Sequence, residues 1–316
     1  MAENIIGVAL SAKNTSEALA TVEHMEDIGI SAVWSTTGGV GGDALTFFAA
    51  AAVRTERILM GTSIIPTYPR HPIVIAQQVQ SLESLAPGRF RLGIGPSHKK
   101  QIEDNYGINF DAPLGRLREY IQILKTLFNN GEVNFDGHYY KANTQIPSPI
   151  NVPVMASALR QKSFELCGEE ADGAISWVCP GVYLRDVAVS AIRSGADRTG
   201  RQTPPLIAHA PVCVHDDAEE VKSAAKEKIG FYPRAPFYAS MFADAGFPEA
   251  SEGTWSDGML DAVVLSGDES EVETRLRELF SFGANEILVT PISAGSDKKG
   301  SMERTLKLLA KVSKSL

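Results

Sequence analysis

The stretch RTERILMGTSIIPTYPRHPIVIAQQVQSLESLAPGRFRLGIGPS, residues 54–97, holds the clearest strand–helix–strand unit of the chain. Residues 57–66 form an apolar run that predicts a strand, and residues 90–94 form a second one. Between them, Pro72 stands at the start of a predicted helix over residues 72–85, where proline is favoured. The strands are apolar along their length, as strands covered on both faces are. This unit therefore predicts a parallel sheet covered by helices.

The same alternation continues on both sides of this unit. Further strands are predicted at 4–10, 30–34, 152–156, 173–178, 206–214 and 286–290. Further helices are predicted at 15–29, 43–53, 113–128, 161–170, 182–194, 218–228, 269–282 and 301–313. Roughly eight strands alternating with helices predict an α/β fold, a (β/α)8 TIM-like barrel, formed by one domain over residues 1–316. An open doubly wound sheet is the alternative.

Two segments interrupt the alternation. Residues 129–151 are rich in Asn, Gly and Pro around a short alternating piece, which predicts an insertion with the character of a hairpin. Residues 230–260 mix aromatic residues, glycines and prolines, and we expect short helices and loops there. The loop STTGGVGGD, residues 35–43, fits neither a Walker A loop nor a dinucleotide fingerprint, so we interpret it as a connector.

Composition and charge limit the possible partners. The formal net charge is −8 and the sequence pI is about 5.4, so an acidic surface would repel the phosphates of nucleic acid. The three cysteines form no CxxC pair, and no cluster has the spacing of metal ligands. No apolar run is long enough to span a bilayer, and the N-terminus lacks the pattern of a signal peptide. We expect a cytoplasmic protein with no metal site, no membrane and no nucleic-acid partner.

In a (β/α)8 barrel the functional residues follow the carboxyl ends of the strands. The strand at 90–94 is followed by Gly95-Pro96-Ser97 and then by His98, whose ordinary pKa of about 6.5 suits proton transfer at neutral pH. The strand at 152–156 leads through small residues to Arg160 at a predicted helix start. Exposed backbone N–H groups, the helix dipole and a cation there suit a phosphate group. A plain capped helix start is the other interpretation of that loop.

Residues 54–97 also carry a family resemblance. Their pattern T-x-R-I-x-x-G-T, R-H-P, A-Q-Q, P-G-R-F and L-G-x-G resembles the bacterial luciferase-like superfamily of flavin and deazaflavin oxidoreductases. The stretches ALATVEHMEDIGISAVW and MASALRQKSFELCGEEADGAISW are similar to the same superfamily. Within it, LGIGPSH followed by YGINF, together with ALRQKSFELCGEEADG, resembles the actinobacterial branch that uses coenzyme F420.

The resemblance implies a TIM-like barrel with a long insertion, and a non-prolyl cis peptide bond behind the central ring of the cofactor, here between Ser63 and Ile64. It also implies that the ring or ribityl chain lies against the Gly95 turn and that the phosphate lies at the fifth strand's loop. The cofactor-binding residues implied in this way are Thr36, Ser63, Ile64, Gly95, Pro96, Ser97, Ala156, Ser157, Ala158 and Arg160. A homodimer is a further possibility that the resemblance raises.

The chain departs from the family at two places. Sugar-phosphate dehydrogenases of the superfamily have an Asp-His pair after the second strand, where this chain has Thr36 and Thr37, and a glutamate where it has His98. These differences argue against sugar-phosphate oxidation and leave His98 and Thr37 as candidate catalytic residues. We predict hydride transfer between F420 and a small organic substrate. The alternatives are an FMN-dependent monooxygenase with a separate reductase, and a non-catalytic protein that binds deazaflavin or flavin.

Overall fold

The computed structural model describes residues 4–11, 14–38 and 41–316 of the chain. The predictions on residues 39 and 40 of the glycine-rich connector and on the first three residues of the chain lie outside this described part. Within the described part, no helix is long and apolar enough to cross a membrane.

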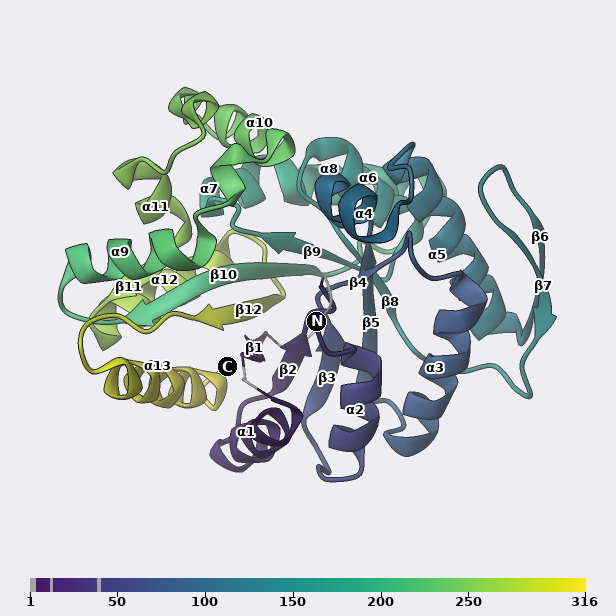
Figure 1. The fold of residues 1–316 in the computed structure, drawn as a ribbon, viewed down its shortest axis with the longest axis horizontal. Helices are drawn as coiled ribbons and strands as arrows, with labels where there is room; N and C mark the ends of the chain where they lie inside the picture. Colours follow the sequence, from purple (N-terminus) through teal and green to yellow (C-terminus); the bar gives the residue numbers. More distant parts are fainter. Residues whose placement is uncertain (1–3, 12–13, 39–40) are drawn as a thin grey trace.

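Eight parallel strands in the described residues close into a barrel (Figure 1). Around the barrel their order is β1, β2, β3, β5, β8, β9, β10 and β12, and β12 pairs with β1 again. Their bounds are β1 Ile5–Ala9, β2 Ala32–Ser35, β3 Leu59–Thr62, β5 Phe90–Gly95, β8 Val154–Ser157, β9 Gly173–Trp177, β10 Leu206–Val214 and β12 Glu286–Pro291. The predicted (β/α)8 fold is confirmed, and the open-sheet alternative is wrong.

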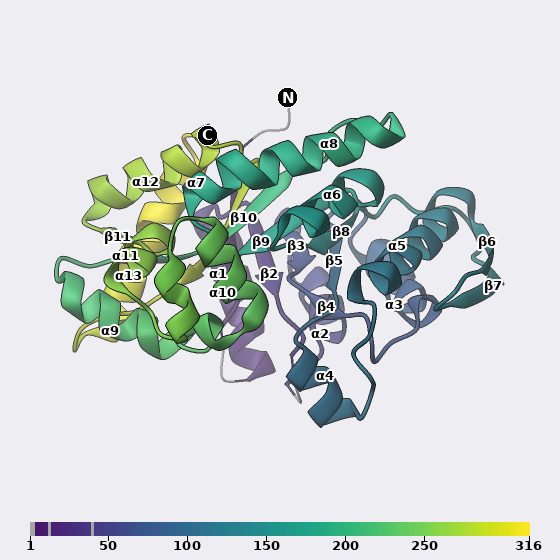
Figure 2. The same ribbon diagram turned by 90° about the horizontal axis from the view of Figure 1, so that it is seen from above.

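Helices follow the strands and cover the outside of the barrel (Figures 1 and 2). The larger ones are α1 Thr15–Ile28, α2 Ala44–Ala52, α3 Pro72–Leu85, α5 Pro113–Asn130, α6 Gln161–Glu170, α8 Val189–Thr199, α9 Ala218–Ile229, α12 Glu269–Ser281 and α13 Lys298–Ser313. Local signals set their ends: Asn14 caps α1 by accepting from the Glu17 N–H, Gly29 ends α1 in the left-handed region, and Pro72 opens α3.

The predicted insertion contains an antiparallel hairpin, β6 Glu132–Asp136 with β7 Lys141–Gln145, which lies beyond α5 at the edge of the molecule in Figure 1. The segment 230–260 forms short helices, as predicted: η2 Tyr232–Arg234, α10 Pro236–Asp244, η3 Pro248–Glu252 and α11 Asp257–Val263. Between β9 and α8 the chain forms the short helix α7 Gly181–Tyr183 and the π-helix η1 Leu184–Ala188.

One local prediction was wrong, and two elements were not predicted. The predicted strand 57–66 divides at Ser63 into β3 and the two-residue β4 Ile65–Pro66, which pairs with β5. Helix α4 Lys99–Tyr106 was not predicted, because its one buried residue, Ile102, leaves no apolar periodicity to detect. Strand β11 Leu265–Gly267 was also missed, since three residues that extend the edge of β10 are too short to show a pattern.

Side chains fill the interior of the barrel. Trp34, Ile175, Ile207 and Leu288 belong to an inner core, one from each of four strands. Gly61 accommodates the Trp34 ring, since a Cβ at residue 61 would lie 2.5 Å from Trp34 Cε3. Because strand side chains alternate, the residues two positions further along these strands also point into the barrel, at its carboxyl end.

At the amino end of the barrel, Arg91 and Glu286 form an ion pair that we call the floor pair. Arg91 Nη1 and Nη2 both donate to the Glu286 carboxylate, the Nη2 group at 3.1 Å. Trp34 Nε1 donates to the same carboxylate at 2.7 Å, and the Arg91 guanidinium lies 4.4 Å from the centre of a Trp34 ring. The side chains of Arg91 and Glu286 are only 11% and 4% exposed, so the floor pair is a buried charge pair.

Candidate active site

The carboxyl end of the barrel, which we call the mouth, has small residues on the side formed by β2, β3, β5 and β8. Thr36 Oγ1 donates to the Ser63 carbonyl at 2.6 Å, which joins the ends of β2 and β3. The peptide bond between Ser63 and Ile64 is cis, as the family resemblance implies. Gly95 is surrounded by protein, since a Cβ there would lie 3.3 Å from Ile64 Cγ1 and would collide with Ser157 Oγ. Thr36, Ser63, Ile64, Gly95 and Ser157 therefore lie next to one another.

The Ser63 hydroxyl fits a polar ligand at this place. Its oxygen is buried and has no hydrogen-bond partner among the residues that the structure describes. Buried hydroxyl groups are normally hydrogen-bonded, so an unsatisfied one beside small side chains indicates a partner supplied by a ligand. The residues of the mouth therefore fit a planar group that carries hydrogen-bonding atoms, such as a deazaflavin or flavin ring.

Thr37 is held by backbone groups on both sides of the connector. It is 8% exposed, and its hydroxyl oxygen accepts a hydrogen bond from the Ala44 N–H at 3.0 Å, at the start of α2. Its own N–H donates to the Ile64 carbonyl at 3.3 Å. These contacts give Thr37 a positioning role, in which it links the connector to the end of β3.

The turn after β5 contains three of the predicted site residues, Pro96, Ser97 and His98, and their side chains make different contacts. Pro96 follows Gly95, and Ser97 takes a left-handed conformation with φ of 64°. The Ser97 hydroxyl donates to Gln101 Oε1 at 3.1 Å, so it is bound to α4. His98 occupies the N-cap position of α4 but its side chain makes no capping hydrogen bond, which leaves the ring available for other contacts.

The His98 ring lies among aromatic side chains of the segment after α9. Its centroid is 5.5 Å from that of Phe231 and 6.2 and 6.1 Å from those of Tyr232 and Tyr238. Burial lowers the pKa of His98 below 6.5, so the ring is neutral at neutral pH. Figure 2 shows α4 and α10 on the same side of the barrel, consistent with these contacts.

The loop after β8 uses several of its N–H groups internally. The Ala158 N–H donates to the Ile175 carbonyl at 2.9 Å, and the N–H groups of Leu159 and Arg160 donate to Ser163 Oγ at 3.0 Å. Ala156 and Ala158 are fully or almost fully buried. The Arg160 guanidinium forms an ion pair with Asp244 of α10 at 3.0 Å, with both side chains about half exposed. Ser163, at the third position of α6, thus caps the start of this helix, as the capped-start interpretation expects, and a phosphate at this loop stays a prediction.

On the opposite side of the mouth the structure places residues that the sequence analysis did not select. Trp177 of β9 and His209 of β10 lie in register, and their ring centroids are 4.1 Å apart. His209 Nε2 is hydrogen-bonded to Thr290 Oγ1 of β12 at 2.7 Å. Part of the His209 ring remains accessible, but loss of hydration lowers its pKa to about 3. The sequence LIAHAPVCV could have indicated this position of His209, because residues 207 and 209 lie on the same face of a strand and Ile207 points into the barrel.

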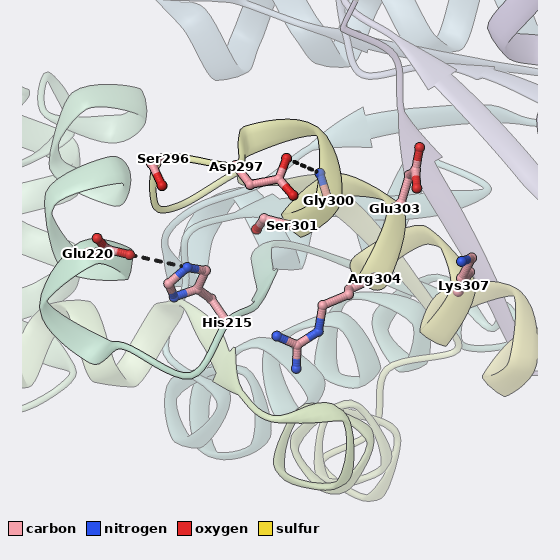
Figure 3. Close-up of a pocket in the computed structure, with 9 residues that line it drawn as sticks. All are labelled: His215, Glu220, Ser296, Asp297, Gly300, Ser301, Glu303, Arg304 and Lys307. Atoms are coloured by element: carbon pink, nitrogen blue, oxygen red, sulfur yellow. Dashed lines mark hydrogen bonds and ion pairs between the residues drawn. The ribbon is translucent and has the colours of Figure 1, made fainter.

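A separate cavity of about 410 Å³ opens beside the mouth, between the loops that follow β10 and β12 (Figure 3). His215 Nε2 lies 3.2 Å from Glu220 Oε2 there, and Asp297 accepts from the Gly300 N–H at 2.9 Å. Arg304 is already paired with Asp216 and Glu269. Acidic and basic side chains both line this cavity, so its charge favours no class of ligand. No group of three metal-ligating side chains occurs in the described residues.

Comparison with known proteins identifies the family. Residues 3–286 match the family model described as luciferase-like monooxygenase. The chain belongs to the luciferase-like monooxygenase family. This luciferase-like protein is 29% identical to the 5,10-methylenetetrahydromethanopterin reductase of Methanolobus tindarius over 90% of its own length and 92% of that relative. It is also 29% identical to the F420-dependent glucose-6-phosphate dehydrogenase of Beutenbergia cavernae, over 79% of its own length and 77% of the relative's.

The fold of the luciferase-like chain matches that of the coenzyme F420-dependent tetrahydromethanopterin reductase from Methanopyrus kandleri. The TM-score is 0.79 at 22% sequence identity, and the match covers 98% of each chain. The resemblance inferred from residues 54–97 is therefore confirmed for the family and for the fold. Relatives of this luciferase-like protein include enzymes whose names specify F420.

Proposed function

We propose that this protein is an F420-dependent oxidoreductase that transfers a hydride between coenzyme F420 and a small organic substrate. The observation that supports this proposal most strongly is similarity over most of the chain to enzymes whose names specify F420. When bound, F420 supplies the hydride chemistry, and the protein binds, orients and shields the reacting groups. The small-residue side of the mouth, with its unsatisfied Ser63 hydroxyl, supports the same proposal.

The ring of the cofactor would lie against the Ser63–Ile64 peptide, Gly95 and Ser157. The Ser63 hydroxyl would hydrogen-bond a polar edge of the ring, since it is buried and unsatisfied by the described residues. Thr36, held to the Ser63 carbonyl, would keep this surface rigid. Pro96 and Ser97 form the turn that borders it, and Ser97 fixes that turn to α4 through Gln101.

The phosphate of the cofactor would lie at the start of α6. Residues 161 and 162 are the first two of that helix, where N–H groups have no acceptor within the helix and the dipole favours an anion. Arg160 is the N-cap residue of this helix, so its guanidinium belongs to the residue directly before these N–H groups. Since Asp244 holds Arg160, binding of the phosphate would compete with that ion pair.

His98 would face the substrate. A neutral imidazole both donates and accepts hydrogen bonds, so His98 can hold a polar substrate atom near the reacting carbon. The Thr37 hydroxyl accepts from the Ala44 N–H and keeps its own proton to donate, so a catalytic role for Thr37 stays a prediction.

Titration of the purified protein with F420 and, separately, with FMN tests the proposal. We expect quenching of protein fluorescence by F420 at micromolar or lower concentration and weaker binding of FMN. Preferential FMN binding would favour the alternative, an FMN-dependent monooxygenase with a separate reductase, to which the description of the family model points. Tight F420 binding with no turnover across reducible substrates would favour a non-catalytic binding protein.

Two further proposals concern assembly and location. A homodimer is proposed from the family resemblance alone, and light scattering during gel filtration would detect it. A cytoplasmic location is supported by three cysteines that are all free and buried, and cell fractionation would test it.

A further inference from the structure

The two sides of the mouth differ in the kind of ligand surface they offer. The β2, β3, β5 and β8 side has small residues, as described above. The other side has four aromatic side chains in contact, Trp177, His209, Tyr232 and Tyr238, which we call the aromatic wall. Trp177 lies 4.1 Å from His209 and 5.7 Å from Tyr232 between ring centroids, and Tyr232 lies 4.8 Å from Tyr238. A cofactor ring on the small side would therefore expose its free face toward aromatic surface.

The aromatic wall carries no net charge at neutral pH. Burial lowers the pKa values of His98 and His209, so both rings are neutral, and it raises the pKa values of Tyr232 and Tyr238, so both hydroxyls stay protonated. Arg160, a cation predicted at the start of α6 on the other side of the mouth, is paired with Asp244 of α10. A phosphorylated or carboxylated substrate would find no unpaired positive group in the wall to offset the loss of its hydration.

Phe231 extends the aromatic wall to the surface. Its side chain is 50% exposed, although a phenylalanine ring is usually well buried. Its ring meets the edge of His98 at a centroid distance of 5.5 Å and is 5.9 Å from Tyr232. Phe231 is therefore the ring of this aromatic segment that a ligand arriving from solvent would contact first.

We propose that the substrate is an uncharged molecule with a planar, conjugated C=C or C=O group, which packs against the aromatic wall, and that Phe231 determines this specificity. The proposal rests on the proposed function. In the reduction, the reduced cofactor gives up one hydride and one proton and is oxidised. The substrate gains the hydride at carbon and a proton from solvent at oxygen or at the neighbouring carbon, and is reduced by the same two electrons.

The test begins with the F420 titration. The protein is then given reduced F420 with 2-cyclohexen-1-one and, separately, oxidised F420 with glucose 6-phosphate. We expect oxidation of reduced F420 by the cyclohexenone and no reaction with glucose 6-phosphate. Preference for the sugar phosphate, or no reaction with the enone despite F420 binding, would overturn this inference and leave the F420 assignment intact. Failure to bind F420 would overturn both.

A matched pair of variants tests the role of Phe231. Phe231→Ala should raise the KM for the cyclohexenone by about fivefold or more with kcat within about twofold, since it removes aromatic contact area from binding and leaves the reacting groups in place. Phe231→Leu should retain most of the affinity. Phe237→Ala is the control, because Phe237 is 58% exposed on the adjacent α10 and makes no ring contact with the wall in the described residues. Equal KM values for Phe231→Ala and Phe237→Ala would refute the specificity role.

Discussion

Replacing Arg91 by methionine should destabilise the protein severely, because the floor pair is buried. The variant leaves the Glu286 carboxylate with the Trp34 N–H as its remaining donor, in a position where the Glu286 side chain is 4% exposed. Loss of one partner from a buried ion pair costs about 3–5 kcal/mol, because the other charge stays desolvated. For a chain of this size we expect Tm to fall by at least about 5 °C.

The double variant Arg91→Met with Glu286→Gln tests the cause of that loss. The glutamine amide can still accept from Trp34 Nε1, but no charge remains inside the barrel. Since no unpaired charge remains, part of the lost stability should return. The glutamine NH2 group has no acceptor there, so we expect the double variant to stay about 1–3 kcal/mol below the parent. Thermal unfolding followed by circular dichroism at one protein concentration measures all three proteins.

Two results would refute this reasoning. A loss below about 1 kcal/mol for Arg91→Met would mean that the pair is hydrated in solution. A double variant no more stable than the single one would mean that Arg91 acts through packing on Trp34 rather than through its charge. The F420 affinity of the double variant should stay within about threefold of the parent, because the floor pair lies at the opposite end of the barrel from the mouth.

Three further predictions concern the mouth. Gly95→Ala should weaken F420 binding by about tenfold, because the new Cβ collides with Ser157 Oγ. Adding Ser157→Gly removes the collision and should restore the affinity. A calorimetric titration in which the double variant binds F420 as weakly as Gly95→Ala would contradict this. Between pH 6.5 and 4.5 the parent should lose stability, because His209 has a folded pKa of about 3 and only the unfolded state takes up a proton there. His209→Gln should reduce this loss by about 1–2 kcal/mol. Urea unfolding at both pH values that shows the same loss for parent and variant would contradict this. Asp244→Asn frees Arg160 and should tighten F420 binding by a few-fold, whereas Arg160→Gln should weaken it. If both variants bind F420 with the affinity of the parent, the phosphate lies elsewhere.

The barrel could be predicted because each of its units carries its own local signal. Apolar runs of strand length, Pro72 at a helix start and Gly29 after a helix are readable without knowledge of the fold. Helix α4 was missed because it is polar almost all round, and ion pairs such as Lys99–Glu103 four residues apart support it in place of apolar packing.

The mouth could be predicted only in part. Gly95 and His98 were found because they follow a predicted strand within a few residues, whereas Ser63 was implied by the family resemblance alone. Trp177 and His209 are brought together by strand pairing, and the aromatic segment around Tyr232 reaches them over a long connection without regular spacing. The partner of Arg160, 84 residues away in the chain, has no local signal at all.

The structure of the complex with F420 tests the central claim most directly. The account predicts a deazaflavin ring against Ser63–Ile64, Gly95 and Ser157, with the phosphate at the start of α6 and the free face of the ring turned toward Trp177 and Tyr232. A ring bound anywhere else, for example in the cavity beside His215, would contradict the assignment of the mouth as the active site.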